Sequence, residues 1–501
     1  MKDALYRINN CDNVAVALTK LKKGVSAETG ELSVIPLDDI EPGHKIALSD
    51  IENEERVIKY GFPIGKARLK IEKGRHVHTH NITTLLSETP VYSYNPAPAQ
   101  PSEWNVPVPE IEVFRRKDGR IGIRNEIWII PTVGCVNKTA ELLAAWATKE
   151  FAGKGIDGVY AWTHPYGCSQ TGLDHELTKT ILANLAKHPN AAAALVLSLG
   201  CENNTLEGFK KALGSYADDN ERMAFLVTQD CEDELAEGKK LLSALAENAA
   251  GARREKAKMS ELIVGMKCGG SDGFSGITAN PLAGRVSDAL CGMGASVILT
   301  EVPEMFGAEQ TLMDRCETGE LFDKTVSLIT DFREYYLSHK QPVYENPSPG
   351  NTAGGISTLE EKSCGCVQKG GKAPVRGVYR YGEQVKAALG GLALLEGPGN
   401  DIVSTTAMTA AGAQLILFTT GRGTPLGAPV PTIKISSNSE LARKKANWID
   451  FDAGGVFETG PDSLSSSLLE LITDIASGRK KTKNELNNYR EIAIFKNGVT
   501  L

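Results

Sequence analysis

From about Ile111 onward, short apolar runs alternate with longer stretches that have helical spacing. EIWIIPTV precedes NKTAELLAAWATKEF, and GVYAWTH precedes an amphipathic stretch that reaches about His188. AAAALVLSL, MAFLVT, ELIVGM and ASVILTEV are each followed by another helical pattern. Strands that alternate with helices form parallel sheets, because each helix crosses over a face of the sheet. The sequence therefore predicts a large α/β catalytic region with Rossmann-like parallel sheets.

The first 82 residues follow a different pattern. Stretches such as AVAL, LSVIPL and HKIALSDI are separated by Gly, Pro and charged turns, which is typical of a small β-rich domain. Pro-rich residues 90–109 form an extended linker, and residues 344–358 form a second loop rich in Gly, Ser and Pro. We therefore predict a β domain at 1–82, a linker at 83–110, an α/β domain at 111–343 and a C-terminal α/β domain at 344–501 that completes the active site.

Charge and cysteine content narrow the class of protein. The chain has 55 Lys and Arg against 62 Asp and Glu, a net charge of −7, which disfavours nucleic acid as a partner. No apolar run approaches the roughly 18–20 residues that span a bilayer, and the first residues lack the apolar core of a secretory signal. We expect a cytoplasmic protein without membrane contact, in which the ten cysteines are thiols and form no disulfide framework.

Four cysteines follow predicted strands directly. They are Cys135 in WIIPTVGC, Cys168 in YAWTHPYGC, Cys201 in LVLSLGC and Cys268 in LIVGMKC. Ligands bind outside the carboxyl ends of parallel strands, so we expect the four thiols to converge on one crevice as metal ligands. Their spacing follows the repeat of strand and helix rather than a short motif, so a small buried side chain at each turn is the alternative. An iron–sulfur cluster on the first three thiols stays open.

Three of the eight histidines fall within five residues, in the sequence HVHTH. Alternate residues of a strand share a face, so we expect His76, His78 and His80 on one side of a strand. Imidazole is a ligand for iron, zinc and manganese, which makes the three residues candidate metal ligands; an exposed polar strand is the alternative. His44, in EPGHKIAL, is a further candidate for this group.

Histidine most often performs acid–base catalysis near neutral pH. His164 and His175 flank Cys168 in THPYGCSQTGLDH and are candidate catalytic residues. Lys45, beside His44, is a third candidate. A structural role is the alternative for each histidine.

Gly-rich polar loops present backbone N–H groups and side chains to an anion. In these loops the candidates for substrate binding are Arg422, Ser271, Asp272, Asn346 and Asn400. A guanidinium can hold a carboxylate with two parallel hydrogen bonds, while an ion pair with an acid such as Asp401 is the alternative for Arg422. No loop matches a Walker A element or a clean GxGxxG, which disfavours a nicotinamide dehydrogenase.

Several of these stretches resemble the motifs of a known enzyme family. GHKIALSDI, HVHTHN, PTVGCVN, YGCSQTGLDH, LGCENN, CGGSDGFSGITANP, LTEVPEMFGAEQ, ENPSPGN, TTGRGTP and WIDFDAG look like those of the altronate dehydratases, in the family that also contains the galactarate dehydratases. The resemblance covers nearly the whole chain. HVHTHN and EVPEMFGAEQ resemble the altronate branch, and residues 13–81 are similar to a SAF domain, a small β-clip-like module.

The resemblance implies a hydro-lyase that converts D-altronate to 2-dehydro-3-deoxy-D-gluconate in galacturonate breakdown. It also implies Fe²⁺, or Mn²⁺, as the cofactor. Galactarate dehydratase, or another 2-hydroxy-acid lyase such as a sulfolactate sulfo-lyase, is the nearest alternative, and a non-catalytic sugar-acid-binding protein is an alternative of another class. The expected partner is a small sugar acid, and the sequence leaves a homo-oligomer open.

Overall fold

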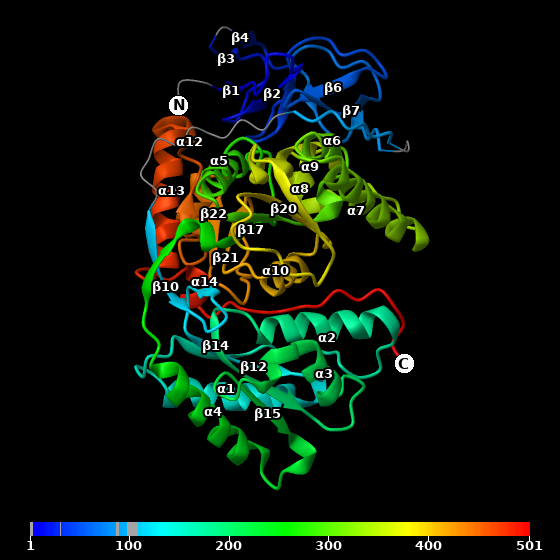
Figure 1. Ribbon diagram of the computed structural model, residues 1–501. Helices are drawn as coiled ribbons and strands as arrows, with labels where there is room; N and C mark the ends of the chain where they lie inside the picture. The colour runs from blue at the N-terminus through cyan, green and yellow to red at the C-terminus, as the bar shows by residue number, and fades with distance from the viewer. Residues whose placement is uncertain (1–3, 31, 87–89, 98–108) are drawn as a thin grey trace.

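The computed structural model describes residues 4–30, 32–86, 90–97 and 109–501, and it arranges them in three parts along one direction (Figure 1). A strand-rich part, which we call the N-terminal module (residues 4–86), lies at one end. A domain around a four-stranded sheet lies at the other end, and a domain around a seven-stranded sheet lies between them. The predicted fold class, a small β domain followed by a larger α/β region, is confirmed.

Short antiparallel strands build the N-terminal module. They are β1 (Leu5–Tyr6), β2 (Val14–Ala17), β3 (Ala27–Thr29), β4 (Leu32–Val34), β5 (Lys45–Ala47), β6 (Arg56–Lys59), β7 (Phe62–Ala67), β8 (His76–Val77) and β9 (Ile82–Thr83). Their sheets have the orders β1-β2-β5-β8, β3-β4 and β6-β7-β9. Val16, Ile46 and Val57 are fully buried in the module.

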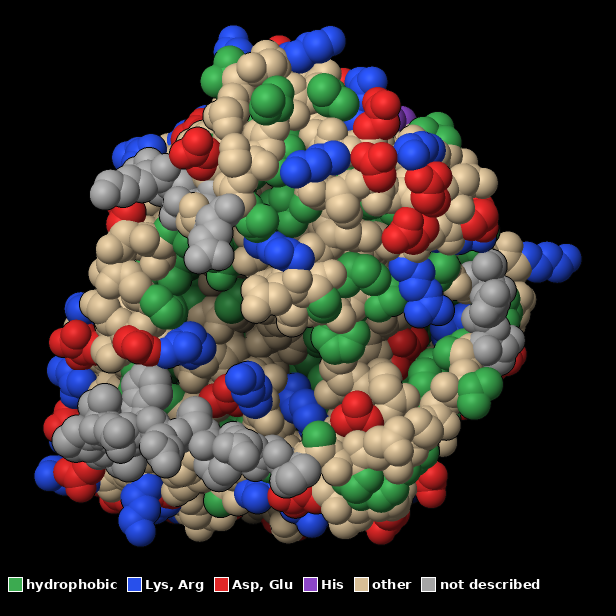
Figure 2. All heavy atoms as spheres, turned by 90° about the horizontal axis from the view of Figure 1, so that it is seen from above, with side chains coloured by type: hydrophobic (Ala, Val, Ile, Leu, Met, Phe, Trp, Pro, Cys, Tyr) green, Lys and Arg blue, Asp and Glu red, His purple; other side chains and the backbone are tan. Residues whose placement is uncertain are grey.

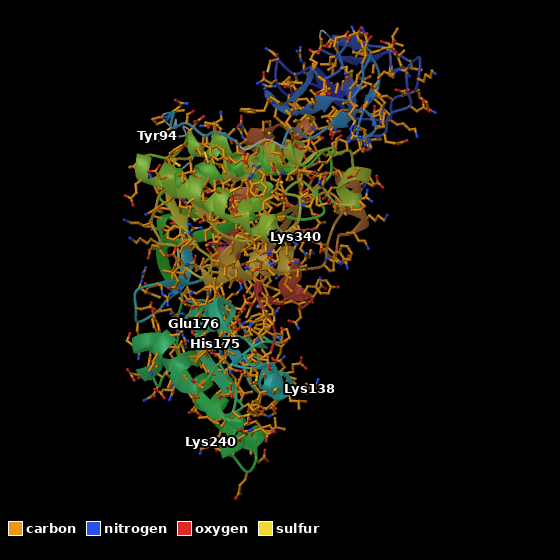
Figure 3. All side chains as sticks on the ribbon, turned by 90° about the vertical axis from the view of Figure 1, so that its right-hand side faces the viewer. Tyr94, Lys138, His175, Glu176, Lys240 and Lys340 are labelled. Carbon is orange, nitrogen blue, oxygen red and sulfur yellow. The ribbon has the colours of Figure 1, made fainter. Side chains whose placement is uncertain are left out.

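The predicted linker at 83–110 includes residues 87–89 and 98–108, which lie outside the described residues. Its described part lies against the seven-stranded sheet domain. Tyr94, labelled in Figure 3, packs on Phe322 with ring centroids 5.3 Å apart, and the Ala97 N–H donates to the Asp314 carbonyl at 2.8 Å. The chain that leaves the module is therefore anchored to its neighbour at these points.

The four-stranded sheet domain is buried on both faces of its sheet. Its elements are β12 (Glu126–Pro131), α1 (Asn137–Glu150), β13 (Gly158–Ala161), α2 (Gly172–Ala186), β14 (Ala191–Ser198), α3 (Leu206–Leu213), β15 (Met223–Val227) and α4 (Glu234–Ala250). A separate antiparallel sheet of order β11-β10-β16 contains β10 (Glu110–Arg115), β11 (Ile121–Gly122) and β16 (Glu255–Lys258), and its apolar residues pack in the core of the seven-stranded sheet domain. The parallel order is β13-β12-β14-β15. Ile127 and Ile129 pack with α1 and α4, while Trp128 and Ile130 pack with α2 and α3. Burial on both faces explains the continuous apolar run of β12.

The seven-stranded sheet is wholly parallel, with the order β19-β20-β18-β17-β21-β22-β23. Its domain contains β17 (Ile263–Cys268), α5 (Ala279–Gly292), β18 (Ser296–Leu299), α6 (Glu309–Met313), α7 (Gly319–Ser338), α8 (Pro349–Ala353), α9 (Leu359–Cys366), β19 (Val375–Tyr379), β20 (Gly391–Leu395), α10 (Asp401–Ala410), β21 (Leu415–Thr420), β22 (Thr432–Ser436), α11 (Ser439–Lys444), β23 (Phe451–Asp452), α12 (Val456–Thr459), α13 (Pro461–Ala476) and α14 (Lys483–Leu486). Leu282 of α5 and Leu468 of α13 belong to one core, while Ala407 of α10 and Ile181 of α2 belong to another. The second core joins the two sheet domains.

The predicted boundary between residues 343 and 344 is wrong. Strands β17 and β18 precede it and strands β19 to β23 follow it, yet all seven belong to one sheet. The structural boundary falls instead after α4, where the chain passes through β16 into β17. Loop composition suggested a division at residues 344–358, but strand pairing, which that composition does not reveal, unites the two sides.

Seen from the end that carries the N-terminal module, Lys and Arg side chains are mixed with Asp and Glu side chains, with no large area of one sign (Figure 2). Within the described part of the chain, every helix is too short or too polar to cross a membrane.

Candidate active site

The carboxyl edge of the seven-stranded sheet collects most of the polar side chains of this domain. Cys268 ends β17, Glu301 follows β18, and Asp401 lies beyond β20. Arg422 follows β21, and Asn438 follows β22. In parallel sheets this edge is where ligands bind.

The N-terminal module packs directly onto this edge. A Cβ atom on Gly273 would lie 1.9 Å from the Gly43 carbonyl oxygen, and one on Gly355 would lie 2.5 Å from the same atom. Any side chain at either position would clash with backbone of the module. Glycine at these two positions therefore permits the close contact between the module and the edge.

A buried ion-pair group joins the module to α9. Lys45 Nζ and Lys59 Nζ lie 2.8 Å and 2.7 Å from the two carboxylate oxygens of Glu361, and all three side chains are at most 1% exposed. Lys45 also donates to the Gly355 carbonyl and to Ser357 Oγ, each at 2.8 Å. All three ammonium protons of Lys45 thus have acceptors, an arrangement that positions the module.

Charges inside this group shift its protonation equilibria. Burial lowers the pKa of Lys45 to about 8, although Glu361 opposes the shift. Burial alone would raise the pKa of the Glu361 carboxyl, but Lys45 and Lys59 outweigh it and hold that pKa at about 2. Glu361 is therefore a carboxylate throughout the physiological range. Whether Lys45 is also catalytic stays a prediction.

Two hollows meet at His44, between the module and the edge. The larger, about 910 Å³, is lined by His44 from the module and by Asp272, Arg422 and Asn438 from the sheet domain. The smaller, about 590 Å³, is lined by His44, His76 and His78 and by the loop at 345–353. We call the two together the cleft.

Arg422 and Asp272 both line the larger hollow. The Arg422 side chain is exposed and has no hydrogen-bond partner among the described residues. Asp401, the acid suggested as its ion-pair partner, instead lies 2.8 Å from Lys267. The structure thus leaves the Arg422 guanidinium available to a ligand.

Asp272 is held rigidly at this position. Its carboxylate accepts hydrogen bonds from Ser275 Oγ and Ser437 Oγ, each at 2.8 Å, and from Asn438 Nδ2 at 3.2 Å. Burial raises the pKa of the Asp272 carboxyl, while these hydrogen bonds oppose the shift. A Cβ on Gly421 would lie 2.2 Å from the carboxyl carbon, so glycine at 421 leaves the carboxylate its place.

The histidines form one group, as predicted, with His44 as a member. The ring centroid of His76 lies 5.1 Å from that of His44, 5.3 Å from that of His78 and 5.4 Å from that of His80. The expected cause is wrong, however, because β8 ends at Val77 and His78 and His80 lie in the following turn. The turn, rather than strand alternation, brings the rings together.

These imidazoles are suited to bind a cation. Burial and the neighbouring positive groups lower the pKa of His76 to about 3, and burial lowers that of His78 to about 4, so both rings are neutral near pH 7. His44 Nδ1 lies 3.0 Å from His76 Nε2. Metal–imidazole bonds are about 2.0–2.1 Å long, so two ligand nitrogens at a right angle lie about 3 Å apart. The 3.0 Å contact is also a hydrogen-bond distance, and His44 Nε2 lies 3.4 Å from the Ala353 carbonyl oxygen, so a divalent ion at this place would replace the contact between the two rings.

His78 and His80 lie in the turn that follows β8. His78 Nε2 lies 2.9 Å from the Thr352 carbonyl oxygen and its Nδ1 lies 3.0 Å from Thr79 Oγ1, so both ring nitrogens already have protein partners. His80 is exposed. Their roles as metal ligands stay predictions.

A fully buried charged cluster lies beneath the loops of the same edge. Its members are Lys267, Cys268, Glu301, Glu304, Lys362, Cys366 and Lys369. Cys268 Sγ lies 3.1 Å from Glu304 Oε2 and 3.3 Å from Cys366 Sγ, and it accepts a hydrogen bond from Lys369 Nζ at 2.6 Å. Lys362 donates to Glu304 at 2.7 Å, and Lys267 pairs with Glu301.

Three side chains of this cluster have the spacing of metal ligands. Among the described residues, one set of three His, Cys, Asp or Glu side chains has all its ligand atoms within 4.8 Å of one another, and it consists of Cys268, Glu304 and Cys366. Ammonium groups of three lysines surround the set, however. Lys362, Lys267 and Lys369 together lower the pKa of Glu304 in spite of its burial. These positive charges would repel an added divalent cation. The chemistry of the set therefore disfavours the predicted metal role of Cys268.

The remaining predicted substrate-binding residues lie at this edge but face the protein. Asn346 Oδ1 accepts from Lys362 at 3.0 Å, and Asn400 Oδ1 caps α10 by accepting from the Val403 N–H at 3.2 Å. Ser271 Oγ is buried without a hydrogen-bond partner, and Ser271 belongs to the loop that carries Asp272. Substrate contact by these three residues stays a prediction.

The other candidates lie in the four-stranded sheet domain. His164 is buried, its Nε2 lies 2.8 Å from the Pro131 carbonyl oxygen, and its Nδ1 accepts from the Tyr166 N–H at 3.1 Å. His175, labelled in Figure 3, lies in α2. The structure therefore does not bring these two histidines to the cleft, because β13 and α2 belong to the other sheet.

The expected convergence of four strand-end thiols is wrong for the same reason. Cys135, Cys168 and Cys201 follow strands of the four-stranded sheet and are exposed, whereas Cys268 ends a strand of the seven-stranded sheet and is buried. Equivalent places in two sheets are not adjacent in space.

Sequence reasoning missed several residues of this edge. Glu361, Glu304, Lys362 and Lys369 are buried charges, which local patterns in a single sequence do not mark. Ser437 and Asn438 had a usable signal, because SSNS directly follows the apolar run of β22. The rule applied to TTGRGTP would have selected them too.

Comparison with known proteins covers all three parts of the chain. A family described as "Altronate/galactarate dehydratase SAF domain" matches residues 3–85, and "D-galactarate dehydratase/Altronate hydrolase, second domain" matches residues 113–250. "D-galactarate/Altronate dehydratase, C-terminal" matches residues 259–500. The second match ends at residue 250 and the third begins at residue 259, and the structural division between the two sheet domains falls between these residues.

Individual relatives extend over the whole chain. Altronate dehydratases of Escherichia coli (strain K12) and Bacillus subtilis (strain 168) are each 49% identical over 99% of this chain and cover 99% and 100% of their own lengths. Galactarate dehydratase (L-threo-forming) of Escherichia coli (strain K12) is 31% identical over 98% of this chain and 96% of its own length.

Proposed function

Because this chain belongs to the D-galactarate/altronate dehydratase family, we propose that it is a hydro-lyase that converts D-altronate to 2-dehydro-3-deoxy-D-gluconate. The observation that carries the proposal is the cleft, which is lined by Arg422, an arginine without a hydrogen-bond partner among the described residues, and by the imidazoles of His44, His76 and His78. The choice of altronate over galactarate rests on 49% against 31% identity over nearly the full length.

The proposed reaction needs a base and a group that stabilises negative charge. The C–H bond next to the carboxylate breaks, and then the C–O bond on the following carbon breaks, so that a proton and a hydroxide leave as water. The resulting enol becomes the 2-keto-3-deoxy acid when a proton returns to carbon 3. Loss of the first proton is difficult because it places negative charge next to a carboxylate.

Arg422 is suited to hold the substrate carboxylate. Its exposed guanidinium can form two parallel hydrogen bonds with a carboxylate, which fixes the adjacent C–H bond in one place. Asp272, in the loop beside it, is suited to accept that proton. Four hydrogen-bond donors fix the carboxylate of Asp272, namely the Ser275 N–H and the side chains of Ser275, Ser437 and Asn438. Burial raises the pKa of this carboxyl, which makes it a stronger base than an exposed carboxylate.

His44 and His76 would hold the divalent ion on the other side of the cleft, with His78 and His80 as further candidates. An ion of this kind acts as a Lewis acid when bound, and it stabilises negative charge on substrate oxygen. The family resemblance favours Fe²⁺, with Mn²⁺ as the alternative. We further place the enzyme in the cytoplasm, where a reducing environment keeps its cysteines as the free thiols that the structure contains.

A substrate panel tests this proposal. The full-length protein, kept anaerobic with ferrous iron, is offered D-altronate, galactarate and sulfolactate, and formation of a 2-keto acid is measured. We expect the highest kcat/KM with D-altronate. Preference for galactarate or sulfolactate would reassign the substrate, and binding of D-altronate without turnover in the metal-loaded protein would contradict catalysis.

A further inference from the structure

The carboxyl edge of the four-stranded sheet carries thiols on three neighbouring strands. In the order β13-β12-β14, the loops past these strands contain Cys168, Cys135 and Cys201. Neighbouring strands of a sheet lie about 4.8 Å apart, so the three loops emerge side by side. We call this place the thiol edge. The proposed dehydration in the cleft makes no use of it.

Hydrogen bonds join the three loops at residues next to the cysteines. The Gly134 N–H donates to the Tyr166 carbonyl at 2.9 Å, which links the Cys135 loop to the Cys168 loop. The Asn204 N–H donates to the Gly167 carbonyl at 2.9 Å, which links the Cys201 loop to the Cys168 loop. The backbone of the thiol edge is therefore one connected unit, and the three thiols cannot move far apart without breaking these bonds.

Close backbone packing holds the unit in place. A Cβ on Gly167 would lie 2.0 Å from the Thr132 carbonyl oxygen, so only glycine lets the Cys168 loop lie against the end of β12. Gly167 and Ser169, on either side of Cys168, both have positive φ angles, of 98° and 57°. Serine rarely adopts this conformation, and such local strain is often found at functional sites.

The thiols face solvent, unlike most of the other cysteines. Cys135, Cys168 and Cys201 are exposed, whereas the five cysteines of the seven-stranded sheet domain are buried. Cysteine is among the most buried residue types in proteins, so three exposed thiols at equivalent positions need an explanation.

The surroundings of the thiol edge favour negative charge. Cys135, Cys168 and Cys201 precede the first residues of α1, α2 and α3, which are Asn137, Gly172 and Leu206. The helix dipole makes a helix N-terminus positive, which suits ligands that carry negative charge. A metal centre bound through three cysteine sulfurs would place such charge here.

The arrangement of the three thiols disfavours a single small ion as their ligand. A zinc ion has Zn–S bonds of about 2.3 Å and tetrahedral angles, which places its sulfur ligands about 3.8 Å apart. Among the described residues, no three ligand atoms that include these thiols all lie within 4.8 Å of one another. A cluster of several irons bridged by sulfide is bound by cysteine thiolates, and it holds its sulfur ligands farther apart than a single ion does.

We propose that Cys135, Cys168 and Cys201 bind an iron–sulfur cluster at the thiol edge, as a site separate from the cleft. Each thiol loses its proton and binds one iron as a thiolate. Three protein ligands on a four-iron cluster leave one iron open to water or to a small oxygen ligand. This inference does not rest on the proposed substrate.

Reconstitution of the full-length protein tests the proposal. The protein is incubated anaerobically with equal amounts of ferrous and ferric iron and with sulfide, so that two irons of each kind and four sulfides make the cluster without an added oxidant. It is then desalted, and its iron, its acid-labile sulfide and its visible absorption are measured. We expect about four iron and about four sulfide per chain in the cluster, with broad absorption in the visible region. Cys135→Ser, Cys168→Ser and Cys201→Ser should each lose most of the sulfide and of the absorption.

Cys11→Ser is the matched control, because Cys11 is an exposed cysteine in the N-terminal module. It should keep the cluster. Circular dichroism shows whether each variant is folded, and alkylation of the wild type gives a second measurement, since the cluster should protect Cys135, Cys168 and Cys201 from iodoacetamide. Bound iron without sulfide, one zinc per chain at these residues, or equal sulfide in folded wild type and variants would overturn the proposal.

Discussion

The loops past the strands of the seven-stranded sheet lie under the N-terminal module, whereas the corresponding loops of the four-stranded sheet carry exposed cysteines. Both edges are carboxyl ends of parallel strands, and both are rich in glycine and cysteine. At the covered edge, Cys268 is buried among lysines and glutamates. At the thiol edge, Cys135 is free to meet a ligand from solvent. The comparison teaches that what packs over a strand end decides the chemistry of its side chains.

The largest expected effect comes from the imidazoles at the covered edge. His76→Ala removes one of the two nitrogens that lie 3.0 Å apart and should lower kcat/KM by at least about 10³-fold, because a Lewis acid contributes several kcal/mol. The bound divalent metal should fall in parallel when it is measured by elemental analysis. His339→Ala, at the exposed C-terminal end of α7, is the control, and it should keep its kcat/KM and its bound metal. Full activity of metal-free His76→Ala would contradict the site.

The second prediction concerns the buried ion pairs that hold the N-terminal module over the carboxyl edge of the seven-stranded sheet. Glu361→Gln leaves Lys45 and Lys59 buried without their counter-charge, which should cost about 3–5 kcal/mol in the free energy of unfolding of the module. Glu320→Gln, which removes an exposed partner of Lys324, should cost no more than about 1 kcal/mol. Urea unfolding followed by tyrosine fluorescence measures both. If the two variants lost the same free energy of unfolding, the buried ion pairs between the module and α9 would contribute little to stability.

A smaller effect is expected for the substrate contact. Arg422→Lys removes the two parallel hydrogen bonds to a carboxylate, and a charge-assisted contact contributes about 1.5–3 kcal/mol. The kcat/KM for D-altronate should therefore fall roughly 10- to 150-fold, with an unchanged melting temperature. Arg479→Lys, at an exposed ion pair with Asp474, should leave both values unchanged. Loss of thermal stability with an unchanged kcat/KM would assign Arg422 to the scaffold.

The smallest effect concerns pH. The pKa of Glu361 is held at about 2 in the folded protein, below the unfolded value of about 4.3. Its contribution to stability is therefore fully present above the unfolded pKa and is lost as the pH falls toward the folded pKa. Between pH 5 and pH 3.5 the wild type should lose about 1 kcal/mol more than Glu361→Gln. Parallel stability curves for the two proteins would contradict this ionisation.

Local pattern was sufficient for much of the candidate site. Apolar runs predicted β17 and β21, and the rule that ligands bind past strand ends selected Asp272 and Arg422, which lie together in the cleft. The grouping of His76 with its neighbours followed from their proximity along the chain. His164 was selected by the same rule, but it lies in the other domain, because the rule does not say which strands share a sheet.

Sequence by itself determined the class of elements, the family and the polar loops at the strand ends, because these depend on residues that are close together along the chain. Tertiary structure alone decided that Cys268 and Cys135 lie at different edges, that residue 343 falls inside a domain, and that Glu361 pairs with two lysines of the module. Each of these outcomes depends on contacts between segments far apart in sequence. Burial then fixes the charge and the accessibility of each side chain, and burial is a property of the assembled fold.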